Sequence, residues 1–209
     1  MDKSVVEQAV REALKKVQGE HKQIKVGVSQ RHIHLSREDL DTLFGKGYEL
    51  TKKKTLMGRE YASEECVTLV GPSLKSIEKV RVLGPVRAKT QVEISRTDTF
   101  ILKVSPPVRP SGKVEGSERI VVVGPKGSVY LKEGVIIANR HIHLTPEYAE
   151  AHGIADGDYV DVMVESIKPT KFYDVQVRVR DDFNVEMHID TDDANSAGLR
   201  NGDIVRIIK

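Results

Sequence analysis

Short runs of valine and isoleucine, separated by glycine, proline, asparagine and aspartate, cover most of the chain from residue 23 onward. Such β-branched, apolar runs between turn residues are typical of β-strands. Because helices do not alternate regularly with these runs, the pattern argues against a doubly wound sheet and favours small barrels or sandwiches. We expect strands at 24–28, 66–70, 79–83, 91–94, 120–123, 135–138, 159–164, 174–179, 185–189 and 204–208.

Residues 4–17 carry a different pattern. Apolar residues recur at i, i+4, i+8 and i+11 from Val6, and most charges lie on the opposite face. This predicts an amphipathic helix with Ser4 as its N-cap, within a tail of residues 1–21. The helix could pack on its own domain or dock on a partner, and the pattern leaves both open. Residues 105–118, rich in proline, glycine and serine, are expected to form a connector.

The composition narrows the classes of function. Lys+Arg number 33 and Asp+Glu 31, a net charge of +2, so we expect neither nucleic acid nor a membrane as a partner. No apolar stretch approaches the roughly 20 residues of a transmembrane helix, and the first residues do not resemble a secretory signal. The single cysteine, Cys66, excludes an internal disulfide, favours a reducing cytosolic setting and is expected to be an inert, partly buried thiol.

A duplicated motif is the strongest signal in the chain. Residues 29–38 read SQRHIHLSRE, and residues 138–147 read ANRHIHLTPE. With only 7 histidines in 209 residues, two H-x-H pairs inside a shared R-H-I-H-L are not expected by chance. Ser36 and Thr145 are predicted N-caps, with Pro146 at the first helical position. Each copy is therefore predicted to be a strand that leads into a short helix.

The spacing of each histidine pair predicts its geometry. Positions i and i+2 of a strand face the same side, so His32 and His34 can approach one ion together. The same holds for His141 and His143, and the isoleucine inside each pair then faces a core. The structural alternative is that the imidazoles only complete hydrogen bonds in a half-buried sheet, which two copies make less favourable.

A second echo supplies further ligands. Residues 92–98 read VEISRTD and residues 187–193 read MHIDTDD, which aligns Glu93 with His188. Taken alone, Glu93 could be a solvated strand carboxylate and His188 a core histidine. Three protein ligands with an open fourth position are typical of catalytic zinc sites, although cobalt, nickel or iron also suit these donors. The two candidate ligand sets are His32, His34 and Glu93, and His141, His143 and His188.

One arginine near these ligands is a candidate for anion binding. Arg87 lies in the segment VLGPVRAKT, after a Gly-Pro turn and a few residues before Glu93. A guanidinium can bind a phosphate in a bidentate manner. The alternative for Arg87 is an ordinary surface charge.

Taken together, these motifs resemble the phosphate propanoyltransferase family, the zinc-dependent phosphotransacylases of propanediol-utilising bacterial microcompartments and related pathways. The resemblance covers about residues 22–209. It implies a mainly β fold of two small β-barrels with short helical caps, in addition to the N-terminal amphipathic helix. It also implies that residues 22–30 join residues 139–209 in one barrel, that residues 31–138 form the other, and that the metal pair lies between them.

The resemblance also implies the chemistry. The reaction would interconvert propanoyl-CoA, or another short acyl-CoA, plus phosphate with acyl phosphate plus coenzyme A. The first ligand set would hold one Zn²⁺ that the coenzyme A sulfur approaches, the second would hold another Zn²⁺, and Arg87 would be catalytic through phosphate. The N-terminal helix resembles the tails that bind microcompartment shell or lumen proteins. The implied location is the microcompartment lumen or the cytoplasm.

Two other functions stay open on the residues alone. A binuclear metal-dependent thioester or phosphoester hydrolase would use the same ligands with a bound hydroxide. A zinc-stabilised scaffold adaptor would close its metal sites with four ligands. Acyl chain length, coenzyme A contacts, the oligomeric state (a homo-oligomer included) and the metal loaded in the cell are not determined by the sequence.

Overall fold

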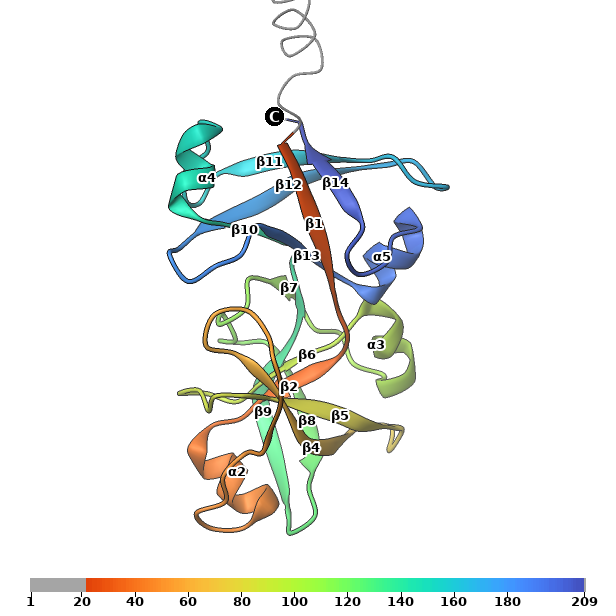
Figure 1. Cartoon of the computed structure of the whole chain (residues 1–209). Coiled ribbons are helices and arrows are strands. Elements are labelled where there is room, and N and C mark those ends of the chain that lie inside the picture. The colour runs from red at the N-terminus through yellow and green to blue at the C-terminus, as the bar shows by residue number, and fades with distance from the viewer. Residues whose placement is uncertain (1–21, 209) are drawn as a thin grey trace, which may run out of the picture.

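The strands of the chain close into two barrels stacked end to end (Figure 1). The structure is a computed structural model and describes residues 22–208. The predicted helix at 4–17 and the tail of residues 1–21 lie outside the described residues. The mainly β fold of two small barrels with short helical caps, expected from the sequence, is confirmed for the part that is described.

The upper barrel in Figure 1 joins the first described strand to the last third of the chain. Its first strand pairs in parallel with β13 and antiparallel with β14, which closes the ring. The chain then leaves this barrel at once and enters the lower one. In ring order the strands are β1 (Lys22–Ser29), β13 (Glu186–Asp190), β10 (His141–Leu144), β12 (Thr170–Val179), β11 (Tyr159–Val164) and β14 (Ile204–Ile207).

The lower barrel is built from the segment between β1 and β10. Pairing of β8 with both β4 and β9 closes its ring. Two short strands, β3 (Lys52–Thr55) and β7 (Val108–Arg109), extend it at β4 and β9. In ring order the strands are β4 (Tyr61–Val70), β5 (Ser76–Gly84), β2 (His32–His34), β6 (Gln91–Glu93), β9 (Ser128–Ala138) and β8 (Glu118–Val123).

Each of four strands runs directly into a capped helix. Ser36 and Thr145 cap α2 and α4 by accepting hydrogen bonds from backbone amides of the first turn, as predicted, and Pro146 begins α4. Ser95 and Asp190 do the same for α3 and α5. These caps satisfy amides that have no partner within the helix and so fix where each strand ends. The helices are α2 (Arg37–Phe44), α3 (Arg96–Leu102), α4 (Pro146–Ala151) and α5 (Thr191–Ala197).

The two barrels have separate cores, and these orient the histidines. Ile33 is fully buried in the core of the lower barrel and Ile142 in the core of the upper barrel. Because neighbouring strand residues face opposite ways, the flanking histidines point out of their own barrels, as predicted. None of the helices within residues 22–208 has the length and apolar character needed to cross a membrane.

Candidate metal centre

Two clusters of three side chains face the region between the barrels. One contains His32, His34 and Glu93, and the other contains His141, His143 and His188. Within each cluster, one ligand atom from each residue lies within 4.8 Å of the others. A divalent ion with bonds of about 2.1 Å could be bound at this spacing after small side-chain rotations. The structure therefore brings together the same two sets that the sequence pairs.

Strand pairing explains why each set converges. Strands β2 and β6 pair with His32 opposite Glu93, and strands β10 and β13 pair with His141 opposite His188. Directly opposite residues of antiparallel strands have neighbouring side chains on one face. The two echoes in the sequence therefore correspond to one local arrangement that occurs once in each barrel.

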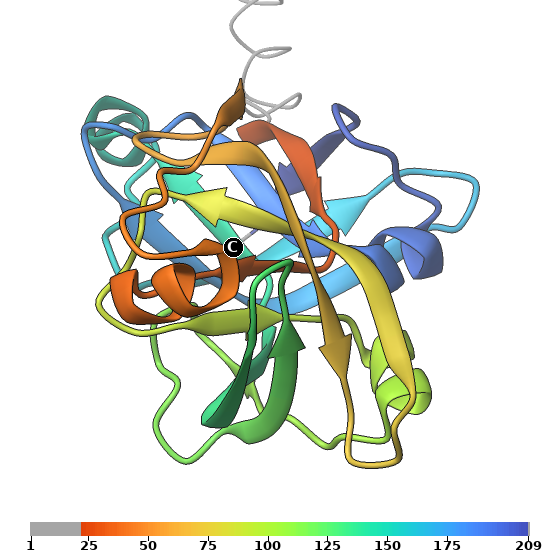
Figure 2. The same cartoon turned by 90° about the horizontal axis from the view of Figure 1, so that it is seen from below.

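A pocket between the barrels contains members of both sets. It is lined by His32 and Glu93 from the lower barrel and by His141 and His188 from the upper barrel. Figure 1 and Figure 2 both place α3 and α5 on the same side of the molecule. There the Thr97 amide and hydroxyl donate hydrogen bonds of 2.7 Å to the Asp192 carboxylate, which joins the two helix starts.

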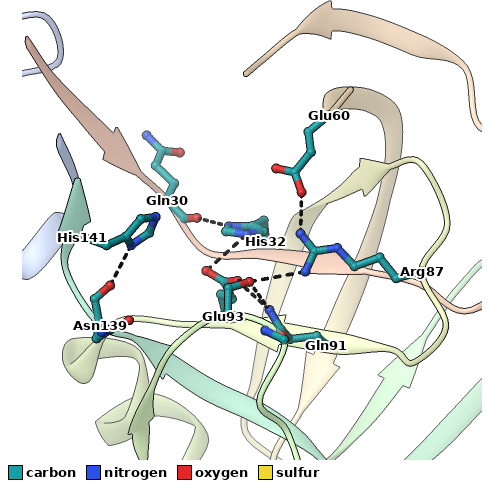
Figure 3. A network of polar contacts seen from close by, with 10 residues as sticks. Gln30, His32, Glu60, Arg87, Gln91, Glu93, Asn139 and His141 are labelled. Carbon is teal, nitrogen blue, oxygen red and sulfur yellow. Dashed lines mark hydrogen bonds and ion pairs between the residues drawn. The ribbon is translucent and has the colours of Figure 1, made fainter. Parts of the chain in front are cut away.

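The first histidine of each pair is oriented by its own chain. His32 Nδ1 lies 2.8 Å from the Gln30 carbonyl, and His141 Nδ1 lies 2.9 Å from the Asn139 carbonyl (Figure 3). A neutral imidazole that donates from Nδ1 leaves Nε2 as an acceptor. Metal-binding histidines are commonly held by such a contact, because it sets both the tautomer and the ring direction.

The second histidine of each pair is buried and neutral, and one of its ring nitrogens has no partner among the described residues. Burial lowers the pKa of His34 and of His143 to about 2, and burial lowers that of His141 to about 4. Within the described chain, the buried Nδ1 atoms of His34 and His143 have no hydrogen-bond partner. A buried, unsatisfied polar atom costs about 1–3 kcal/mol. Neutral imidazoles with unsatisfied nitrogens fit a metal ion, which would bind these atoms.

Glu93 is held by a hydrogen-bond network (Figure 3). Its Oε1 accepts from Gln91 Nε2 at 2.6 Å and from Ser111 Oγ at 2.7 Å, while Oε2 lies 3.5 Å from His32 Nε2. Burial alone would raise the pKa of Glu93, but His32, the Ser111 hydroxyl and the charge of Arg87 together lower it. The carboxylate is therefore ionised at neutral pH and has one oxygen directed at the histidines.

Arg87 lies beside this network, at the start of the loop after β5. Its Nη2 pairs with Glu60 Oε1 at 2.5 Å, and its Nη1 lies 3.3 Å from Ser111 Oγ. Its charge acts on both Glu93 and His34, lowering their pKa values. Nη2 of the guanidinium is therefore bound to Glu60, and Nη1 faces Ser111 and the first ligand set.

The arginine at the start of each R-H-I-H-L motif faces the helix that follows the neighbouring strand of its metal-ligand set, α3 after β6 for Arg31 and α5 after β13 for Arg140. Arg31 makes an ion pair with Asp98, in which Nη2 lies 2.7 Å from Oδ1. The side chain of Asp98 is only 1% exposed. Asp98 also accepts from the Ser95 amide and so completes a capping box at α3. In the other half the equivalent distance, from Arg140 Nε to Asp193 Oδ2, is 3.6 Å. Arg31 thus ties β2 to the segment that follows Glu93.

Several residues of the site were not recognised from the sequence. Ser111 belongs to the segment expected to be a connector, yet it binds Glu93. Glu60 pairs with Arg87 across 27 residues, for which no periodic pattern exists. Glu186 Oε2 lies 3.2 Å from His188 Nε2. Only Glu186 had a signal, because it precedes His188 by two residues on a strand and so faces the same side.

Two reactive residue types lie elsewhere. His152, which belongs to neither candidate ligand set, caps the end of α4. Its Nδ1 lies 2.7 Å from the Tyr148 carbonyl, and its ring stacks on that of Tyr148. Cys66 is a free, half-buried thiol on β4. Neither of them lines the pocket between the barrels.

The fold and the pocket define a class of protein, a double β-barrel with a candidate dinuclear metal centre between the barrels. A family profile described as Phosphate propanoyltransferase matches residues 25–200. The chain therefore belongs to the phosphate propanoyltransferase family, which is a family of acyltransferases.

Individual relatives agree with this assignment, and each of the following is named phosphate propanoyltransferase. A protein of Thermotoga maritima is 56% identical over 187 residues, which is 89% of this chain and 89% of the relative. One of Lachnoclostridium phytofermentans is 50% identical over 185 residues, covering 88% and 87% of the two chains. One of Listeria monocytogenes is 43% identical over 206 residues, covering 99% and 94%.

Proposed function

We propose that this protein transfers an acyl group between coenzyme A and phosphate at a dinuclear zinc centre. It would interconvert propanoyl-CoA, or another short acyl-CoA, plus phosphate with acyl phosphate plus coenzyme A. The observation that carries the proposal is the pocket in which His32 and Glu93 of one barrel face His141 and His188 of the other. The names of the relatives support the reaction class.

The proposed ligands of the first Zn²⁺ are His32, His34 and Glu93, and those of the second are His141, His143 and His188. His₂Glu and His₃ are both donor sets of catalytic zinc sites, and each leaves a coordination position for a substrate. Bound zinc would supply positive charge that polarises the thioester carbonyl and stabilises the leaving thiolate. Cobalt, nickel or iron could occupy the same donors.

The proposed transfer is direct. A phosphate oxygen attacks the thioester carbonyl carbon, the carbon–sulfur bond breaks, and the proton of the attacking hydrogen phosphate leaves with the sulfur as a thiol. The chain need not supply a nucleophile, and Cys66 lies away from the pocket lining. The chain contributes by holding both reactants in the orientation of attack, which lowers the entropic part of the barrier.

Arg87 is the proposed phosphate ligand in the lower barrel. Glu60 fixes one guanidinium nitrogen and leaves the other directed at Ser111, which itself donates to Glu93. A guanidinium that is held in advance loses little entropy when it binds an oxyanion. Arg87 would therefore bind phosphate rather than contribute to binding of the thioester.

The direct test is a thiol-release assay with propanoyl-CoA, with and without phosphate and with and without a chelator. We expect release that requires phosphate, stops on chelation and returns with added Zn²⁺. His143→Ala should abolish it, whereas His152→Ala, a matched histidine outside both ligand sets, should not. Release without phosphate would instead identify the binuclear hydrolase, and protein-bound zinc with no release under any condition would identify a scaffold protein.

We also propose that residues 1–21 form a targeting tail for a bacterial microcompartment, with the cytoplasm as the alternative location. The support is the amphipathic pattern of residues 4–17. A chain truncated to begin near Gln23 should keep its activity and no longer co-purify with shells. Co-purification of the truncated chain would contradict the proposal without affecting the proposed catalysis.

A further inference from the structure

One half-buried guanidinium in the upper barrel has a buried nitrogen without a partner among the described residues. Arg178 lies on β12, and its Nη2 is buried without a hydrogen-bond partner among the described residues. Within residues 22–208, its guanidinium forms no side-chain hydrogen bond or ion pair, although the charges of Glu93 and Asp156 act on it. Arg87, by contrast, pairs with Glu60, and Arg81 donates to the carbonyls of Ser63 and Glu64. Buried atoms of charged groups are normally paired, so the unpaired Nη2 of Arg178 indicates that an anion is missing from this position.

The strand register places Arg178 at the candidate metal centre. Strands β10 and β12 run parallel, with His143 beside Arg178. Val177 is buried in the core of the upper barrel, so Arg178 faces the opposite way, as His143 does. The charge of Arg178 lowers the pKa of both His141 and His143, and Glu93 acts on Arg178 in turn.

Neither of the two carboxylates that act on Arg178 is paired with it among the described residues. Asp156 Oδ1 accepts a hydrogen bond from the Val179 amide at 2.8 Å, and Glu93 has other partners. Glu93 Oε1 accepts from Gln91 and Ser111, and its Oε2 is directed at His32. If the three imidazoles hold a dication as proposed, it would repel the guanidinium beside them, because like charges at close range in a partly buried site repel strongly. An anion between the guanidinium and the ion reverses the sign of both interactions.

The duplication of the site shows that Arg178 is not required by the metal-binding framework. In the lower barrel the corresponding position, beside His34 on the parallel neighbour strand, is Leu83. Both halves hold the same type of histidine pair, so the framework tolerates an apolar residue there. The arginine is therefore a feature of one half only, and it lies on the barrel opposite to that of Arg87.

We propose that Arg178 is a second anion-binding residue of the active site, which contacts the phosphate or acyl phosphate from the upper barrel while Arg87 contacts it from the lower barrel. This inference rests on the proposed function. Two guanidinium groups from two barrels would hold the phosphate in the orientation of attack and would favour the dianion over neutral acyl groups. The upper barrel would then contribute to phosphate specificity as well as to metal binding.

The test compares Arg178→Gln and Arg178→Lys with the wild-type zinc-loaded enzyme. Arg119→Gln, which removes the same charge from an exposed site on β8, is the control. Three quantities are measured for each variant: zinc content, binding of inorganic phosphate by calorimetry without coenzyme A, and the Michaelis constants for phosphate and propanoyl-CoA. Calorimetry keeps the test independent of turnover.

Arg178→Gln should weaken phosphate binding and raise the KM for phosphate by about 10- to 100-fold, the loss expected for a charge-assisted hydrogen bond. Zinc content and the KM for propanoyl-CoA should stay unchanged, and Arg178→Lys should restore part of the affinity. Unchanged phosphate binding in Arg178→Gln would overturn the inference. Loss of zinc together with phosphate would also overturn it, in favour of a structural role. Absence of phosphate-dependent thiol release in the wild type would instead contradict the proposed function, and phosphate calorimetry would still decide the role of Arg178.

Discussion

Replacing Arg31 with glutamine should destabilise the lower barrel far more than replacing Arg140 destabilises the upper one. Arg31 Nε donates to both Asp98 oxygens, at 2.9 and 3.0 Å, and Nη2 lies 2.7 Å from Oδ1. The Asp98 side chain is almost fully buried. Without the guanidinium, its carboxylate would stay buried with the hydrogen bond from the Ser95 amide but without its counter-charge.

The magnitude follows from exposure and geometry. Removing one partner of a fully buried ion pair costs about 3–5 kcal/mol. The Arg31 side chain is 41% exposed, so water screens part of the interaction, and we expect about 2 kcal/mol for Arg31→Gln. Arg140 Nε lies 3.6 Å from Asp193, and both side chains are partly exposed, so Arg140→Gln should cost less than about 1 kcal/mol.

Urea unfolding of the zinc-free proteins, followed by far-ultraviolet circular dichroism, measures both effects. With a slope of about 1–3 kcal/mol per molar urea, Arg31→Gln should lower the midpoint by about 1 M. Arg140→Gln, the matched control at the same motif position, should lower it by well under half of that. Equal shifts, or a larger shift for Arg140→Gln, would refute the assignment of Arg31 as the residue that ties β2 to α3.

Four further outcomes are expected. Arg87→Ala should raise the KM for phosphate by about 10- to 100-fold and leave that for propanoyl-CoA nearly unchanged; steady-state kinetics in which phosphate use is unaffected would exclude the role. No acyl group should be trapped on Cys66 or on a serine during turnover, as intact-protein mass spectrometry can show. A chelator should abolish thiol release, and Zn²⁺ should restore it. Burial lowers the pKa of His34 and His143, so below pH 6.5 the unfolded chain binds more protons than the folded one. The free energy of unfolding of the zinc-free protein should therefore fall, as the pH is lowered, by up to about 1.4 kcal/mol per pH unit for each histidine. Equal stability in urea at pH 7 and pH 5.5 would contradict this. Burial raises the pKa values of Asp190 and Asp193, so these groups increase the free energy of unfolding as the pH falls, but only under more acidic conditions.

The strands of the fold could be predicted because burial leaves a local pattern. The runs at 66–70 and 120–123 lie in β4 and β8, whose buried residues alternate with more exposed ones. Strand β3 (Lys52–Thr55) was missed, because all four of its residues are exposed and it is held only by pairing with β4. The exchange of β1 into the barrel of β13 and β14 depends on long-range pairing, which no local pattern encodes.

The candidate ligands were visible for a different reason, which is duplication. The strand register turns two sequence echoes into two local arrangements, with Glu93 opposite His32 and His188 opposite His141. The residues that support them had no such signal. Ser111 binds Glu93 from an irregular loop. Arg178 could be recognised as part of the site only from the strand register, which places it beside His143 on β10.

The central claim, that two histidine-rich sets of ligands each bind one divalent ion in the pocket between the barrels, is tested most directly by anomalous diffraction at the zinc edge from crystals of the zinc-loaded protein. We expect two peaks, one among His32, His34 and Glu93 and the other beside the upper-barrel histidines. Peaks remote from both sets, or no peak at either, would contradict the account.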